Sequence, residues 1–116
     1  MSYGLADITV LATCDQSEAY EVDETHIGVD DKTAKFVIAS ASGCSCWDGE
    51  YDVEEYDTLA DLERALLLSE RQYNPSLRSI AEIIQEARAT AAAKKIPRIG
   101  RQPKEVKEMV AKLLAA

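Results

Sequence analysis

"VDDKTAKFVIAS", residues 29–40, decides the fold because it has the pattern of a β-hairpin. Residues 30–33 supply the polar side chains that turns favour. The residues on either side are rich in the β-branched and aromatic types that strands favour. Because a hairpin joins antiparallel strands, the stretch predicts an antiparallel sheet.

Further strands are predicted on both sides of this hairpin. Apolar and polar residues alternate over about 6–14, which indicates a first strand. Over 20–29 the alternation changes phase, and a bulge or break near 23–25 would reconcile the two halves. A short fourth strand is expected over 51–56. The sequence does not reveal the order of the strands.

The second half of the chain changes to a helical period. Leucines recur at helical spacing after Thr58, which predicts a helix over about 58–72 with a capping residue at its start. Asn74 and Pro75 form a second start signal, followed by apolar residues spaced three and four apart over about 75–95. The prolines and glycine of 96–103 interrupt this helix.

A third, amphipathic helix is expected over about 103–115. The prediction is therefore an α+β fold: a small antiparallel sheet of three or four strands, about 5–56, covered on one face by two helices, with a C-terminal helix added. We divide the chain into one α+β domain (1–96), a basic linker (97–102) and an amphipathic helix (103–116).

Length and composition limit the classes of protein. A chain of 116 residues is enough for one domain with one core. No apolar run approaches the roughly 20 residues of a membrane span, and the N-terminus lacks the pattern of a secretory signal. We expect a cytoplasmic protein, without membrane contact, whose three cysteines are thiols or metal ligands.

The net charge of −8 is unevenly divided. Residues 1–57 contain 14 acidic and 2 basic residues, whereas residues 58–116 contain 7 acidic and 11 basic residues. Such an uneven distribution of charge is informative about the partners that a protein attracts, and less so about its fold.

The most acidic segment is also the most aromatic. Residues 47–57 carry six acidic residues, three aromatic residues and no basic residue, a composition that suits a basic protein surface. The alternative is a sheet edge kept charged against aggregation, with its aromatics facing the core. The expected partner-binding residues are Trp47, Asp48, Glu50, Tyr51, Asp52, Glu54, Glu55 and Tyr56.

A zinc site is the sharper interpretation of the cysteines. All three cysteines and the only histidine would form a Cys3His set, Cys14, His26, Cys44 and Cys46. The C-x-C spacing is tighter than the usual knuckle, however, and buried structural thiols are the alternative. Acidic neighbours disfavour a redox pair because they stabilise the thiol over the thiolate. We expect no cofactor, with zinc as the alternative.

The C-terminal region offers two further partners. Six basic residues lie within 94–107, but nucleic acid is disfavoured by the acidic half, and these residues could equally bind the acidic face of a second copy. The apolar face of the last helix could dock on its own core or mediate a homodimer. The expected self-association residues are Val106, Met109, Val110, Leu113 and Leu114.

No catalytic constellation emerges, because His26 has no evident nucleophile and no glycine-rich phosphate loop is present. We therefore expect a protein that is not an enzyme.

The segment "SASGCSCWDGEY", followed by acidic residues and "TLADLERAL", resembles small bacteriophage-encoded proteins of unknown role that carry an S-G-C-S-C segment. The resemblance covers about 20–68. It implies no particular activity or residue roles, but it favours a phage-encoded accessory protein in the host cytoplasm, a class that often binds and inhibits a host protein. The leading hypothesis is thus a non-catalytic protein-binding module that uses its acidic, aromatic surface, and the alternative is a zinc-stabilised structural domain that self-associates through its last helix.

Overall fold

The computed structural model describes residues 8–15, 21–44, 51–68 and 77–115, and these form the predicted α+β fold. The strands are β1 (Ile8–Asp15), β2 (Glu21–Asp30), β3 (Phe36–Cys44) and β4 (Asp52–Tyr56), and they form one antiparallel sheet in the order β1-β2-β3-β4.

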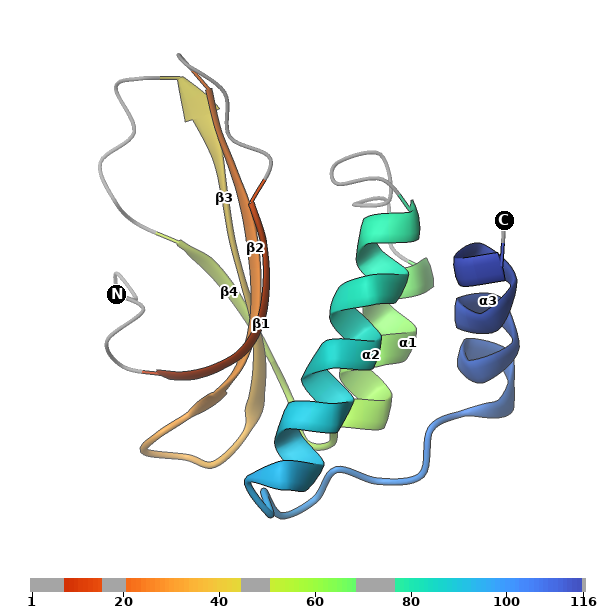
Figure 1. The fold of residues 1–116 in the computed structure, drawn as a ribbon. Coiled ribbons are helices and arrows are strands. Elements are labelled where there is room, and N and C mark those ends of the chain that lie inside the picture. The colour runs from red at the N-terminus through yellow and green to blue at the C-terminus, as the bar shows by residue number, and fades with distance from the viewer. Residues whose placement is uncertain (1–7, 16–20, 45–50, 69–76, 116) are drawn as a thin grey trace.

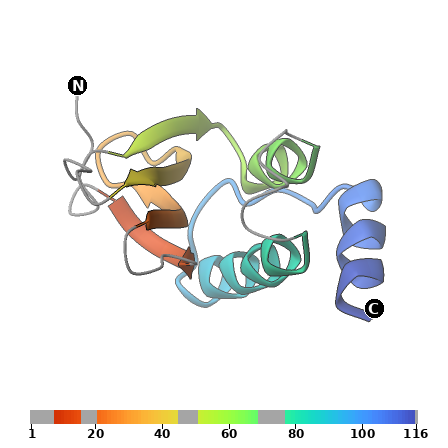
Figure 2. The same ribbon diagram turned by 90° about the horizontal axis from the view of Figure 1, so that it is seen from above.

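The three helices form two further layers. They are α1 (Leu59–Leu68), α2 (Leu77–Ala93) and α3 (Lys104–Ala115). α1 and α2 lie side by side against one face of the sheet, and α3 lies on the far side of that pair (Figures 1 and 2). None of the described helices lies on the other side of the sheet, which we call the open face. None of the described helices is long and apolar enough to cross a membrane.

The hairpin between β2 and β3 forms as its sequence predicts. Oδ1 of Asp30 accepts hydrogen bonds from the backbone N–H groups of Lys32, at 2.8 Å, and Thr33, at 3.3 Å. Asp30 is thereby satisfied although it is buried. Ala34 adopts a φ of 61°, and its carbonyl accepts a hydrogen bond from Arg98 at 2.8 Å, which ties the turn to the segment after α2.

The expected break in β2 is wrong, because the irregularity lies in β1. β2 pairs with β3 without interruption through 23–25, whereas the register of β1 shifts between Val10 and Ala12. The extra residue lets both Leu11 and Ala12 join the core beneath the helices. The phase change in β2 needs no break because both faces of this sheet carry apolar side chains.

The core is correspondingly divided. The larger cluster, which we call the helix-side core, includes Ile27, Phe36, Leu62 and Ile84 of the sheet and the α1–α2 pair and extends to Val106 of α3. The smaller cluster, on the open face, consists of Ile8, Val37 and Ala39 with Tyr51 and Val53 packed against it. The open face is therefore only partly polar.

Local signals fix the helix ends. Oγ1 of Thr58 accepts a hydrogen bond from the N–H of Asp61 at 3.1 Å and caps α1. α2 ends at Ala93 because Lys95 adopts a φ of 55°, while the N–H groups of Lys95 and Ile96 bond back to carbonyls of the last turn. This is a Schellman ending in which a lysine takes the place that glycine usually occupies.

A buried ion pair fastens the segment between α2 and α3. The carboxylate of Glu63 is fully buried and accepts two hydrogen bonds from Arg88, at 2.6 and 3.0 Å, and one from Gln102 at 2.9 Å. Arg88 also donates to the carbonyl of Gly100 at 2.9 Å, and Ala60 donates to that of Ile99. Residues 97–102 are thus held against α1 and α2.

Candidate functional site

The acidic segment forms an edge of the sheet. Among the described strands, β4 pairs only with β3, so one side of its backbone has no strand beside it. Asp52, Glu54 and Glu55 are all exposed on it. We call β4 with these three carboxylates the acidic edge.

The carboxylates of the acidic edge point to both sides of the sheet. Glu54 pairs with Ile38, a residue of the helix-side core, and Glu55 pairs with Val37 of the open-face cluster. Cross-strand partners point to the same face, so neighbouring carboxylates on β4 flank the strand from opposite faces. The three carboxylates therefore do not form one acidic face of the sheet. What they have in common is their position along its edge.

The two tyrosines of this segment serve mainly in packing. Tyr56 packs against the helix-side core and donates a hydrogen bond to Glu54 at 2.7 Å. Tyr51 packs against the open-face cluster. Burial raises the pKa of both phenols, and nearby Glu24 raises that of Tyr51 further. Trp47, Asp48 and Glu50 of the predicted surface lie outside the described residues.

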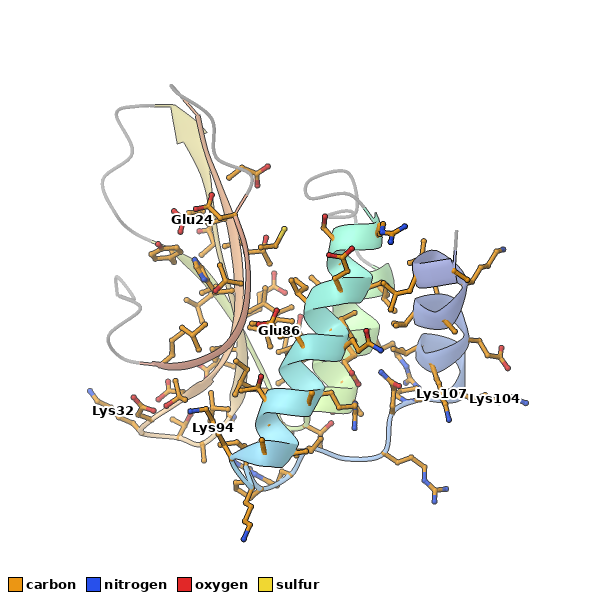
Figure 3. The ribbon with its side chains drawn as sticks, viewed as in Figure 1. Glu24, Lys32, Glu86, Lys94, Lys104 and Lys107 are labelled. Carbon is orange, nitrogen blue, oxygen red and sulfur yellow. The ribbon has the colours of Figure 1, made fainter. Side chains whose placement is uncertain are left out.

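A polar network on the open face surrounds His26, which is only 4% exposed. Its Nδ1 lies 2.8 Å from the hydroxyl of Thr13, and its Nε2 lies 3.0 Å from Oε1 of Glu24. The same carboxylate oxygen accepts a hydrogen bond from Tyr51 at 3.3 Å, and the tyrosine ring meets the imidazole edge-on at 5.5 Å. Figure 3 labels Glu24 near the upper end of the sheet.

The positions of the protons in this network follow from which of its groups can donate a hydrogen bond and which can only accept one. An ionised carboxylate can only accept, so Nε2 of His26 carries the proton that is donated to Glu24. In the neutral ring Nδ1 then accepts from the hydroxyl of Thr13. The network satisfies a buried imidazole and joins β1, β2 and the residue before β4.

Sequence reasoning missed this network, although one signal for it was present. Glu24 and His26 are two residues apart on one strand, so their side chains leave the same face. The contribution of Thr13 could not be foreseen, because it depends on the pairing of β1 with β2 that places Thr13 opposite His26.

The predicted zinc set is not assembled by the residues that the structure describes. Cys14 lies opposite Thr25 and packs against the helix-side core, whereas His26 lies on the open face. The sheet separates the two side chains, so they cannot bind the same ion. Cys44 ends β3 but its side chain is outside the description, and so is Cys46; within the described part, no three His, Cys, Asp or Glu residues are grouped to hold a metal.

The thiol of Cys14 has the surroundings of a packing residue. Burial is the largest influence and raises its pKa, a hydrogen bond with Ser79 acts in the opposite direction, and Asp23, Asp15 and Glu82 raise it further. A raised pKa leaves little thiolate at neutral pH and makes the group a poor nucleophile.

The apolar face of α3 is docked on the rest of its own chain. Val106 and Val110 are buried in the helix-side core, and Leu113 and Leu114 pack against it. Met109 is 37% exposed. The apolar face of α3 was expected either to dock on its own chain or to mediate a homodimer. The structure shows docking on its own chain, and self-association stays a prediction.

Neither a protein-family model nor a curated protein or solved structure matches the chain.

Proposed function

We propose that the chain is a non-catalytic protein-binding module that takes up a basic, extended segment of a partner along the acidic edge. The observation that carries this proposal is the exposure of Asp52, Glu54 and Glu55 on alternating sides of an edge strand.

The alternation supports an edgewise rather than a face-on approach. A partner lying on one face of the sheet would meet only the carboxylates of that face. A strand added beside β4 would place its own side chains alternately above and below the sheet, opposite carboxylates on both sides. A basic side chain on the added strand would then lie near a carboxylate of β4 on either face of the sheet.

Strand addition also supplies the affinity that exposed charges lack. A surface ion pair contributes about 0.2–1 kcal/mol, so three carboxylates alone give weak binding. In peptide recognition by strand addition, the main-chain hydrogen bonds of the edge provide most of the affinity. The carboxylates would then select a basic segment.

The same charges also disfavour pairing between the β4 edges of two copies of the chain. Edge strands are sites of unwanted pairing between copies of a protein, and like charges on two such edges repel each other. The acidic edge therefore disfavours pairing with itself while remaining open to a basic strand. If the chain is a phage accessory protein, a class that its resemblance favours, we propose that the partner is a host protein which the binding inhibits.

The test uses a short synthetic peptide in which lysine and valine alternate, titrated into labelled protein and followed by NMR. We expect the largest shifts, and slowed amide exchange, at residues 52–56. The double variant Glu54→Lys, Glu55→Lys should abolish these changes. Glu86→Lys, a charge reversal at an exposed residue of α2, is the matched control and should bind normally (Figure 3).

A second peptide separates strand addition from simple charge attraction. It has the same sequence with alternate backbone nitrogens methylated, so it keeps its charge but loses half of its main-chain donors. Strand addition predicts loss of binding. Equal binding of both peptides, or shifts outside β4, would rule the proposal out.

A further inference from the structure

A groove runs between α2 and α3 on the side of the molecule away from the sheet. Its volume is about 450 Å³, and its apolar lining comes from both helices, namely Ala89, Ala92, Val110, Ala111 and Leu114. Figures 1 and 2 both show α3 beside the α1–α2 pair on the side opposite the sheet. The groove is thus formed mainly by α2 and α3 and by none of the residues of the acidic edge.

One end of this groove is basic. There it continues into a depression of about 700 Å³ lined by Arg88, Arg101, Gln102, Lys104 and Lys107. Arg88, Gln102 and Lys107 border both hollows, so the apolar and basic parts form one surface. Figure 3 labels Lys104 and Lys107 near the start of α3.

Half of the four basic side chains that line this end have no ion-pair partner in the described part of the chain. The charge of Arg88 is neutralised by Glu63, and Lys104 lies 4.0 Å from Glu108. Arg101 and Lys107 have no ion-pair partner in the described part of the chain. From Arg88 to the C-terminus the sequence has eight basic and two acidic residues. At physiological salt the Debye length is about 8 Å, so these nearby cations outweigh the distant acidic sheet.

The basic end is held in place before any ligand arrives. Arg88 donates to the backbone carbonyl of Gly100 and the side chain of Gln102 donates to Glu63, so the residues on both sides of Arg101 are held in place. Burial of Val106 anchors the start of α3 below Lys104 and Lys107. A prearranged site loses less conformational entropy on binding.

We propose that this groove binds an acidic amphipathic peptide segment of another protein. Its apolar side chains would lie between α2 and α3, and its carboxylates would meet Arg101, Lys104 and Lys107. Helical peptides are commonly bound in this way, by anchors spaced along an apolar groove. The small side chains of Ala89, Ala92 and Ala111 let a peptide backbone approach closely.

A peptide fits better than a small molecule because the groove is shallow. Ala89, Ala92 and Ala111 are all exposed, whereas small-molecule sites enclose about 70–90% of their ligand. The groove shares no element with the acidic edge, and its partner would carry the opposite charge.

The test measures fluorescence anisotropy of a labelled peptide in which leucine recurs every third and fourth residue and glutamate occupies the other positions. Lys107→Glu should raise the Kd of the protein for this peptide roughly tenfold, and added salt should raise the Kd of the wild-type protein as well. Ala92→Leu should block binding by filling the groove. The matched controls are Lys112→Glu and Ala93→Leu, exposed residues of the same two helices that do not line it.

Three further measurements expose competing explanations. Equal affinity for a peptide with lysine in place of glutamate would overturn the proposal, as would absence of binding by the folded wild-type protein. Binding of dodecanoate but not of the peptide would make the groove a fatty-acid site instead. Sedimentation of the protein alone tests the remaining occupant: self-association that Lys107→Glu abolishes would assign the groove to a second copy.

Discussion

The buried ion pair of Glu63 and Arg88 should respond differently to the loss of each partner: loss of Arg88 should destabilise the protein more than loss of the charge on Glu63. Replacing Arg88 by methionine leaves the carboxylate of Glu63, which is 0% exposed, with Gln102 as its remaining described donor. Removing one partner of a buried ion pair costs about 3–5 kcal/mol. We therefore expect Arg88→Met to lower the free energy of unfolding by that amount.

The opposite change should be milder. Glu63→Gln removes the charge but nearly preserves the volume, and the side chain of Arg88 is 25% exposed, so water can solvate part of it. Its hydrogen bond to Gly100 also survives. The expected loss is about 1.5–3 kcal/mol, the usual range for a hydrogen bond to a charged group.

Urea unfolding at neutral pH, followed by circular dichroism, measures both losses with a common slope. The double variant Glu63→Leu, Arg88→Met should be more stable than Arg88→Met alone, because no buried charge is left unpaired. If Glu63→Gln cost as much as Arg88→Met, or if the double variant were the least stable, the carboxylate would not be the buried charge that the pair protects.

Two other predictions concern backbone packing and pH. Gly28→Ala should destabilise the fold by about 1–3 kcal/mol in thermal unfolding, because the new Cβ would lie 2.7 Å from the carbonyl oxygen of Thr9; a loss no larger than at an exposed strand position would contradict this. Burial raises the pKa of Cys14 above its ordinary value of 9.0, so the folded state keeps the proton longer than the unfolded state. Stability should therefore fall as the pH rises above 9.0, and in a background with Cys44 and Cys46 replaced by serine, Cys14→Ala should remove that part of the slope; an unchanged slope would refute it.

Much of the fold could be predicted because its signals are local. Residues 30–33 form the turn that their polar side chains indicate, and Thr58 caps α1 as its position suggests. α2 ends close to the predicted residue, with Lys95 in the left-handed conformation before Pro97. Such signals act within a few residues, so periodicity and capping patterns are enough to locate them.

The candidate site was less predictable because strand pairing decides which residues meet. The acidic segment of 51–56 is visible in the sequence, but its place at an edge depends on the sheet order. Cys14 and His26 were grouped by residue type, yet the register places them on opposite faces. A shift of one residue in either strand would have reversed that outcome.

The sequence by itself determined the antiparallel hairpin, the three helices and the division between an acidic first half and a basic second half, since each follows from neighbouring residues or from composition. Only the tertiary structure decided that Glu63 meets Arg88 across 25 residues, that α3 docks on its own chain, and that an apolar groove opens beside Arg101 and Lys107. These features depend on how helices pack against one another, and helix packing joins residues whose separation along the chain carries no periodic signal.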